Sequence, residues 1–288
     1  MELAGEIFDP LVSDVSFQVR IAALEKLGPL IAELGREHTS EALVDHFVSM
    51  AESSGPLQLT CAFNFPGVAV TIGRGRWGEI KGAYGILAGS MQWRVRRTLA
   101  FSLHEMAKIL GEDLSEVDLL PVFEEMLGDT DEVSIGVVSH LAAFMRELTP
   151  AARLPHLHLL PAIGAAEGDM IGNWRLRAAL SQQLAALSGI LPAHANEQSL
   201  LPLLLRLLKD PASAVRTASV EAVGAALQNT VKGAASSWLS GTLGGVLAEM
   251  KLMATNPRWA DRQAYVQICG AFVGVVDRGV VRRCRLNR

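Results

Sequence analysis

Hydrophobic positions recur along this chain with a helical spacing and a period close to 38 residues. Each repeat starts from an anchor residue, which is usually apolar and followed by Arg. Positions four, eight and eleven residues after the anchor lie on the same face of an α-helix. The anchor and these three positions recur in seven repeats, and only Ser219 and Asp261 among them are not apolar. The steps between anchors are 38, 38, 38, 43, 39 and 46 residues, and the anchors are Val19, Leu57, Val95, Val133, Leu176, Val215 and Asp261.

A second amphipathic segment precedes each anchored helix after the first, and a turn with Pro, Gly, Asp or Asn joins the two. Such turns let the chain leave one helix and cap the next. A hairpin of about 40 residues cannot bury its apolar face alone, so successive hairpins must stack. We therefore expect an all-α, right-handed α-solenoid of about seven hairpins, with the anchored helices lining its concave face. The preceding segments are residues 41–51, 77–88, 115–127, 154–166, 198–208 and 238–253.

The period and the pattern Asp-x4-Val-Arg resemble the HEAT repeat. The pattern spans Asp14 to Arg20 and Asp210 to Arg216. The resemblance implies that such an Arg reaches back to an Asp in a hairpin turn and builds a ladder from repeat to repeat. The ladder is incomplete because the other repeats lack the Asp, although Asn256 takes its place before Arg262. The expected structural ladder is Asp14, Arg20, Arg96, Arg177, Asp210 and Arg216.

Irregular positions modify this picture. Pro66 should kink or end its helix, because proline removes an amide donor and clashes with the preceding turn. The longer steps predict longer loops around residues 148–173 and 229–258. We expect no domain boundary there, so residues 1–288 form a single HEAT-repeat solenoid. Its ends lack polar caps, which favours a segment of a longer array.

Composition excludes several classes of protein. Of 288 residues, 26 are Lys or Arg and 30 are Asp or Glu, so the chain lacks the cationic field that binds nucleic-acid backbones. The three cysteines show neither a disulfide framework nor a zinc spacing, as expected in a reducing compartment. No apolar stretch is long enough to cross a bilayer, and no targeting peptide is recognisable. We expect a cytoplasmic protein, with the nucleus as a second compartment, and no membrane or nucleic-acid partner.

Two motifs imitate catalytic or cofactor sites. Residues 73–78 spell G-x-G-x-x-G, but no acidic residue follows at the distance that would hold a ribose. His104-Glu105 starts like a zinc-protease helix, yet Lys108 replaces the second His. We therefore interpret the first motif as a hairpin turn and expect no catalytic, cofactor or metal site and no enzyme.

Candidate partner contacts come from two similar motifs at the start of anchored helices. Trp and Arg dominate many protein interfaces. The simpler alternative is that each Trp packs on a neighbouring hairpin turn and its first Arg is only solvated. The candidate partner-binding residues are Trp93, Arg94, Arg97, Trp174 and Arg175.

Several segments resemble one family in the same order along the chain. They are residues 61–73, 76–77, 91–105, 131–137 and 173–178. Together they are similar to the regulatory subunit 1 family of protein phosphatase 4, which is related in architecture to the scaffold subunit of protein phosphatase 2A. The resemblance implies a non-catalytic regulator that binds a serine/threonine phosphatase catalytic subunit, of type 4 or 2A-like, and directs it to substrates. It also implies that Pro66 is a family feature, and it supplies no motif that fixes contact residues.

Two alternatives remain at this point. A HEAT-repeat adaptor for transport or complex assembly, of the importin or condensin-associated kind, would use a similar surface, and acidic residues concentrated on the inner face would favour it. An enzyme resembling phycobilin lyases is the other alternative. The repeats of those enzymes are shorter, so the observed step of 38 residues argues against it.

Overall fold

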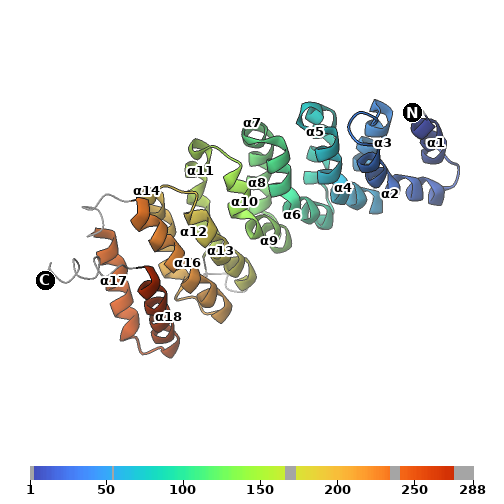
Figure 1. Ribbon diagram of the computed structural model, residues 1–288. Helices are drawn as coiled ribbons and strands as arrows, with labels where there is room; N and C mark the ends of the chain where they lie inside the picture. Colours follow the sequence, from blue (N-terminus) through green and yellow to red (C-terminus); the bar gives the residue numbers. More distant parts are fainter. Residues whose placement is uncertain (1–2, 54, 166–172, 234–240, 276–288) are drawn as a thin grey trace. The chain divides into compact units, whose positions relative to one another are not determined.

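The computed structural model describes residues 3–53, 55–165, 173–233 and 241–275, and every regular element in these ranges is a helix (Figure 1). The chain divides into two compact units, residues 1–137 and 138–288. Each unit is a stack of helical hairpins with its own core. The all-α class is confirmed, whereas the right-handed sense and the single uninterrupted array over 1–288 stay predictions.

The first unit places its anchored helices next to one another and its preceding helices behind them. Helix α4 packs against α2 and α6, while α3 and α5 pack on α4 and on each other. The elements are α1 (Leu3–Val12), α2 (Phe17–Leu34), α3 (Glu41–Glu52), α4 (Pro56–Ile72), η1 (Arg74–Arg76), α5 (Trp77–Ala88), α6 (Trp93–Leu110), α7 (Glu112–Leu114), η2 (Ser115–Leu119), α8 (Leu120–Leu127) and α9 (Asp131–Ser139).

An aromatic cluster fixes the hairpins of the first unit. The buried ring of Phe65 lies 5.5 Å from Phe47 and 5.0 Å from Tyr84, measured between centroids. Trp77 packs edge-on against Tyr84 at 5.7 Å, and its Nε1 donates a hydrogen bond of 2.8 Å to Asp118 Oδ2. Because these rings come from α3, α4 and α5, the cluster joins two successive hairpins.

The second unit repeats the arrangement with a leucine-rich core. Helix α16 packs between α13 and α18, and α15 and α17 pack on the anchored helices. Leu180, Leu184 and Leu204 are fully buried between these helices. The elements are α10 (Leu141–Arg146), α11 (Pro150–His156), η3 (Leu157–Leu159), α12 (Leu160–Ile163), α13 (Trp174–Ser188), α14 (Ala193–Ala195), η5 (Asn196–Leu200), α15 (Leu201–Leu207), α16 (Ser213–Gly233), α17 (Gly241–Ala254) and α18 (Trp259–Val275).

The anchored stripe is buried as predicted through α4, α6, α9, α10, α13 and α16. In α2 the stripe is shifted, since Val19 and Leu30 are half-buried and Ile31 is fully buried. The polar exception Ser219 is buried and donates to Val215 O at 2.7 Å. A hydroxyl that bonds to its own helix backbone therefore fits a position where the pattern expects an apolar residue.

Two sequence expectations need correction. Pro66 does not end its helix, because α4 continues to Ile72 with buried residues on both sides of the proline, whereas the expected kink stays a prediction. The expected long loops also contain helices. Pro150 and Pro161 lie in the first turns of α11 and α12, where a missing amide donor costs nothing, and the glycines from Gly241 onwards lie inside α17. Residues 166–172 and 234–240 of those loops lie outside the described residues.

Candidate functional site

The two Trp–Arg motifs adopt the same local geometry. Trp93 begins α6 and Trp174 begins α13, and each is 39% exposed. The Cζ atom of Arg94 lies 5.1 Å from the Trp93 ring centroid, and that of Arg175 lies 5.0 Å from the Trp174 centroid. Each Arg thus stacks on its own Trp and leaves part of the ring surface open to a partner. Their role in partner binding stays a prediction.

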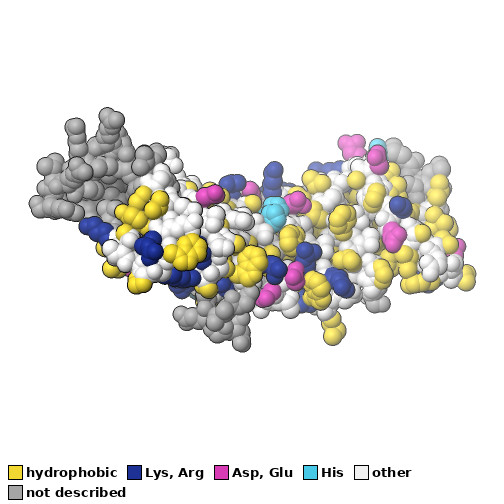
Figure 2. Space-filling model, turned by 90° about the horizontal axis from the view of Figure 1, so that it is seen from below, with side chains coloured by type: hydrophobic (Ala, Val, Ile, Leu, Met, Phe, Trp, Pro, Cys, Tyr) yellow, Lys and Arg dark blue, Asp and Glu magenta, His cyan; other side chains and the backbone are white. Residues whose placement is uncertain are grey.

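An exposed aromatic at this position recurs more widely than the sequence analysis recognised. Phe17 begins α2 and is 57% exposed, and Trp259 begins α18 and is 65% exposed. Arg20 lies 5.4 Å from the Phe17 centroid. The sequence alone could have revealed this recurrence, since each of these aromatic residues stands two residues before its anchor. Figure 2 shows exposed hydrophobic side chains lying among Lys and Arg side chains.

Arg97 is held by contacts within the first unit. Its Cζ lies 4.7 Å from the Phe101 ring centroid, and its Nε is 3.6 Å from Glu132 Oε2. The side chains of Arg97 and Glu132 are 44% and 59% exposed, so this ion pair contributes little to stability. The charge of Arg97 therefore stays available at the surface.

The expected ladder exists, but its contacts within each hairpin differ from the expected ones. Arg20 Nη1 donates to the main-chain oxygen of Asp14 at 2.6 Å, and Arg216 Nη1 donates to that of Asp210 at 2.8 Å. Arg96 makes the same contact with Ser90 O at 2.6 Å. The carboxylates of Asp14 and Asp210 accept hydrogen bonds from backbone amides of their own turns. Each Arg therefore binds a main-chain carbonyl oxygen, which a residue other than Asp also provides.

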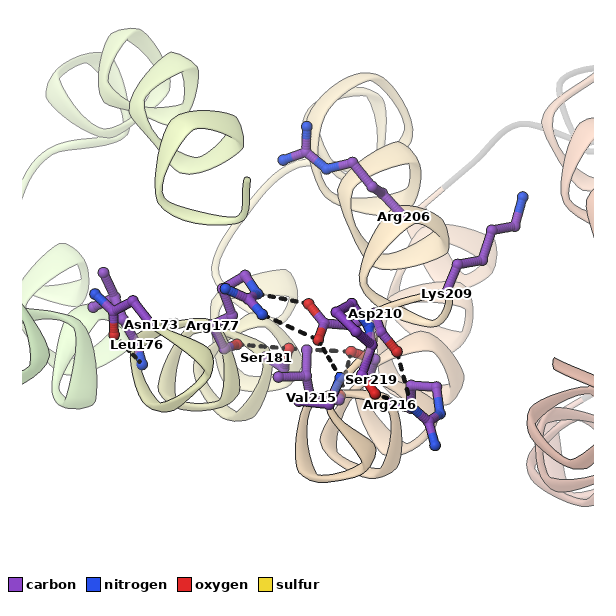
Figure 3. A network of polar contacts seen from close by, with 12 residues as sticks. Asn173, Leu176, Arg177, Ser181, Arg206, Lys209, Asp210, Val215, Arg216 and Ser219 are labelled. Atoms are coloured by element: carbon purple, nitrogen blue, oxygen red, sulfur yellow. Dashed lines mark hydrogen bonds and ion pairs between the residues drawn. The ribbon is translucent and has the colours of Figure 1, made fainter. Parts of the chain in front are cut away.

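Between hairpins the ladder does use carboxylates. Arg177 Nε and Nη2 donate to Asp210 at 2.6 and 3.2 Å, and Figure 3 shows the two side chains pointing toward each other, away from Arg206 and Lys209. Arg96 binds Asp129 in the same bidentate way, at 2.5 and 2.8 Å. Both pairs are separated by 33 residues, a spacing that could have identified Asp129, which the sequence analysis missed.

The two pairs differ in burial. The side chains of Arg177 and Asp210 are 0% and 1% exposed, whereas those of Arg96 and Asp129 are 19% and 15% exposed. Hydrogen bonds from Arg96 lower the pKa of Asp129. Each pair joins a helix to the next hairpin turn, and the structural role of these residues stays a prediction.

The glycine motif that imitates a nucleotide site lies at a hairpin turn. Residues 73–76 form the turn between α4 and α5, residues 77 and 78 begin α5, and Gly73 has a φ of 79°, which favours glycine. Within the described residues, no group of three or more His, Cys, Asp and Glu is placed to hold a metal ion. In the same part of the chain, no helix is both long and apolar enough to cross a membrane.

The fold and the ladder define a class of protein: an α-solenoid of HEAT-like two-helix repeats. Residues 200–229 match the HEAT repeat family model. Residues 61–163 match the model described as the protein phosphatase 4 regulatory subunit 1 middle domain. The resemblance expected from the sequence is thereby confirmed.

Curated relatives extend the similarity beyond that segment. The chain is 37% identical over 239 residues to human serine/threonine-protein phosphatase 4 regulatory subunit 1, and 35% identical to the mouse and rat proteins of the same name. Each match covers 81% of this chain and 25% of the relative. The chain therefore spans about a quarter of the length of these relatives.

Among solved structures, a designed armadillo repeat protein in complex with a (KR)4 peptide aligns with 92% of this chain and 98% of its own. The TM-score is 0.37 and the identity is 12%. This likeness is too low to bear on function.

Proposed function

We propose that this chain is part of a non-catalytic regulatory subunit that binds the catalytic subunit of a serine/threonine protein phosphatase, of type 4 or 2A-like, and directs it to substrates. The observation that carries the proposal is the 37% identity, over 81% of the chain, to a protein named as a phosphatase 4 regulatory subunit. Stacked hairpins suit this role because they present an extended surface over which affinity is spread.

The surface chemistry supports a protein partner. Trp93 and Trp174 are part-exposed and each is stacked by an Arg, the residue types that carry much of the energy of protein interfaces. The free cysteines Cys61 and Cys269 are compatible with a reducing compartment. The proposal therefore includes a location in the cytoplasm and in the nucleus.

The experiment is a binding assay with purified components. The 288-residue chain is mixed with separately expressed catalytic subunits of phosphatases 4, 2A and 6 and analysed by size-exclusion chromatography with light scattering. Co-elution with one of them supports the regulatory role and identifies the enzyme. A helical, monodisperse chain that co-elutes with none of the three contradicts catalytic-subunit binding by this segment.

Variants then test the Trp–Arg motifs. Changing Trp93 and Arg94 together to Ala should weaken the complex and leave helical content unchanged by circular dichroism. Met91 is 99% exposed in the turn just before Trp93, so Met91→Ala is the matched control and should have no effect. If helical content falls in the double variant, the motif supports the core and is not an interface.

Catalysis is tested separately. The chain alone should hydrolyse p-nitrophenyl phosphate no faster than buffer. Hydrolysis that co-purifies with the chain through two orthogonal columns would contradict the non-catalytic role.

A further inference from the structure

Helix α4 has no charged residue in its 17 positions, yet one of its sides is open to solvent. A helix that is apolar on all sides is normally enclosed by other elements. Leu59 is 37% exposed, Phe63 76% and Val70 62%. Contiguous apolar surface of this kind marks an interaction site in soluble proteins.

The exposed residues Leu59, Phe63 and Val70 form one continuous stripe with the half-buried Pro66. Helices α2 and α6 pack against two sides of α4, and α3 and α5 cover a third. Leu59, Phe63, Pro66 and Val70 are spaced by four, three and four residues, so they follow one another along the remaining side. We call these four residues the α4 stripe. It is about 16 Å long at a rise of about 1.5 Å per residue, or three helical turns.

Positive charge lies beside one end of the stripe. The step of 38 residues puts Arg97 of α6 level with Leu59 and Arg94 level with the first residue of α4. Both guanidinium groups stack on aromatic rings of their own helix, which fixes their direction. Arg94 makes no ion pair with any residue that the structure describes, and Arg97 has only the long contact with Glu132.

The other flank carries charges of both signs. Helix α2 exposes Glu25, Lys26 and Glu33, so this flank has no excess of positive charge. The surface around the stripe is therefore basic on the α6 side and mixed on the α2 side. A partner that matches it carries acidic groups toward α6.

We propose that the α4 stripe docks an amphipathic helix of a partner protein, with the apolar face of that helix on the stripe and its acidic residues against Arg94 and Arg97. A helix fits better than a strand because the backbone donors and acceptors of α4 are already bonded within α4, so the helix offers no edge for strand pairing. A ridge of side chains at helical spacing packs against a second helix.

A synthetic peptide tests this surface directly. The probe is an 18-residue amphipathic helical peptide with Leu at the spacing of the stripe and Glu on the flanking positions. Its affinity for the full 288-residue chain is measured by fluorescence anisotropy. A peptide with Lys in place of Glu and a scrambled peptide are the comparison probes. The test needs no phosphatase, so its outcome is independent of the function proposed above.

Three variants give the expected pattern. Phe63→Asp should lower the affinity for the Glu peptide about tenfold or more, because it places a charge in the apolar contact. The double variant Arg94→Glu with Arg97→Glu should bind the Glu peptide with lower affinity and the Lys peptide with higher affinity than the wild-type chain. Val117 is 70% exposed in η2, outside the stripe, so Val117→Asp is the matched control and should change neither affinity.

Several outcomes would overturn the proposal. These are a wild-type chain that binds none of the peptides, equal binding of the scrambled peptide, and unchanged affinity in Phe63→Asp. A concentration-dependent dimer that Phe63→Asp abolishes would assign the stripe to a second copy of this chain. Circular dichroism checks folding, and Val70→Asp is the second variant if Phe63→Asp loses helicity.

Discussion

Removing the carboxylate of Asp210 should strongly destabilise the second unit. In Asp210→Ala the guanidinium of Arg177, 0% exposed, keeps its charge and loses both bonds to the carboxylate. Breaking a buried ion pair in this way costs about 3–5 kcal/mol, because the guanidinium stays buried without the carboxylate of Asp210. The turn also loses the bond of 2.8 Å from the Ala212 amide to Asp210 Oδ1.

The matched perturbation is Asp129→Ala in the first unit. It removes a pair of the same geometry whose side chains are 19% and 15% exposed, so water replaces part of the lost interaction. We expect a cost of about 1–2 kcal/mol there. The two variants therefore test the effect of burial at nearly constant chemistry.

The assay is urea unfolding followed by far-ultraviolet circular dichroism, combined with hydrogen exchange of peptides from each unit. Exchange is needed because stacked repeats do not always unfold in one transition. Protection should fall most in α13 and α16 for Asp210→Ala, and in α6 and α9 for Asp129→Ala.

Equal destabilisation by the two variants would refute the reasoning from burial. A second check is Arg177→Met with Asp210→Leu, which removes both charges and fills the space. This double variant should regain most of the stability lost in Asp210→Ala. If it is as unstable as the single variant, the cost comes from lost shape and turn bonding and not from burying the guanidinium without its carboxylate.

Three further predictions concern other sites. Arg96 lowers the pKa of Asp129, so this carboxylate stabilises the fold fully above the unfolded carboxyl pKa of about 4. The contribution is lost as the pH falls below that value and the carboxylate of the folded chain is protonated. Asp129→Asn should therefore reduce the loss of stability that acid causes, measured by urea unfolding at a series of pH values. Gly136→Ala would bring a Cβ to 2.7 Å from the Phe101 ring, so it should cost about 1–3 kcal/mol in urea unfolding. Burial raises the pKa of the Cys61 thiol to about 12, so the native chain at pH 8 should resist alkylation there, and modification seen by mass spectrometry would contradict the burial.

Much of the fold could be predicted because the apolar spacing and the period are both set by burial. The anchor of α4 and of α6, and the positions four, eight and eleven residues after it, are buried as expected. The deviation in α2 has a physical cause. Among the described anchored helices, α2 packs against only α4, so Val19 and Leu30 at the edge of its stripe stay half-buried. Periodicity predicts which face of a helix is buried, whereas the number of neighbouring helices decides how much of that face is covered.

The ladder could be predicted only in part, because its contacts between repeats depend on geometry that a pattern within one repeat does not contain. Asp129 has no Arg six residues later, as Asp14 has, and was missed for that reason. Ser134 follows the anchor Val133, where other repeats have Arg, and donates to Met126 O and Leu127 O at 3.2 and 3.1 Å. The partner of Asp129 is instead Arg96 of the preceding repeat, 33 residues earlier.

The candidate surface was harder still to predict, because apolar residues covered by the chain itself and those covered by a partner have the same composition. A comparison between repeats separates the two. At the positions where α6 has Arg97 and Lys108, α4 has Leu59 and Val70, and the backbone of both helices is continuous. The fold therefore accepts charge at these positions. The same step of 38 residues aligns Phe63, which is 76% exposed, with the exposed Glu25 of α2. Phe63→Asp should therefore leave stability nearly unchanged while it removes binding, a combination that a residue serving the core would not show.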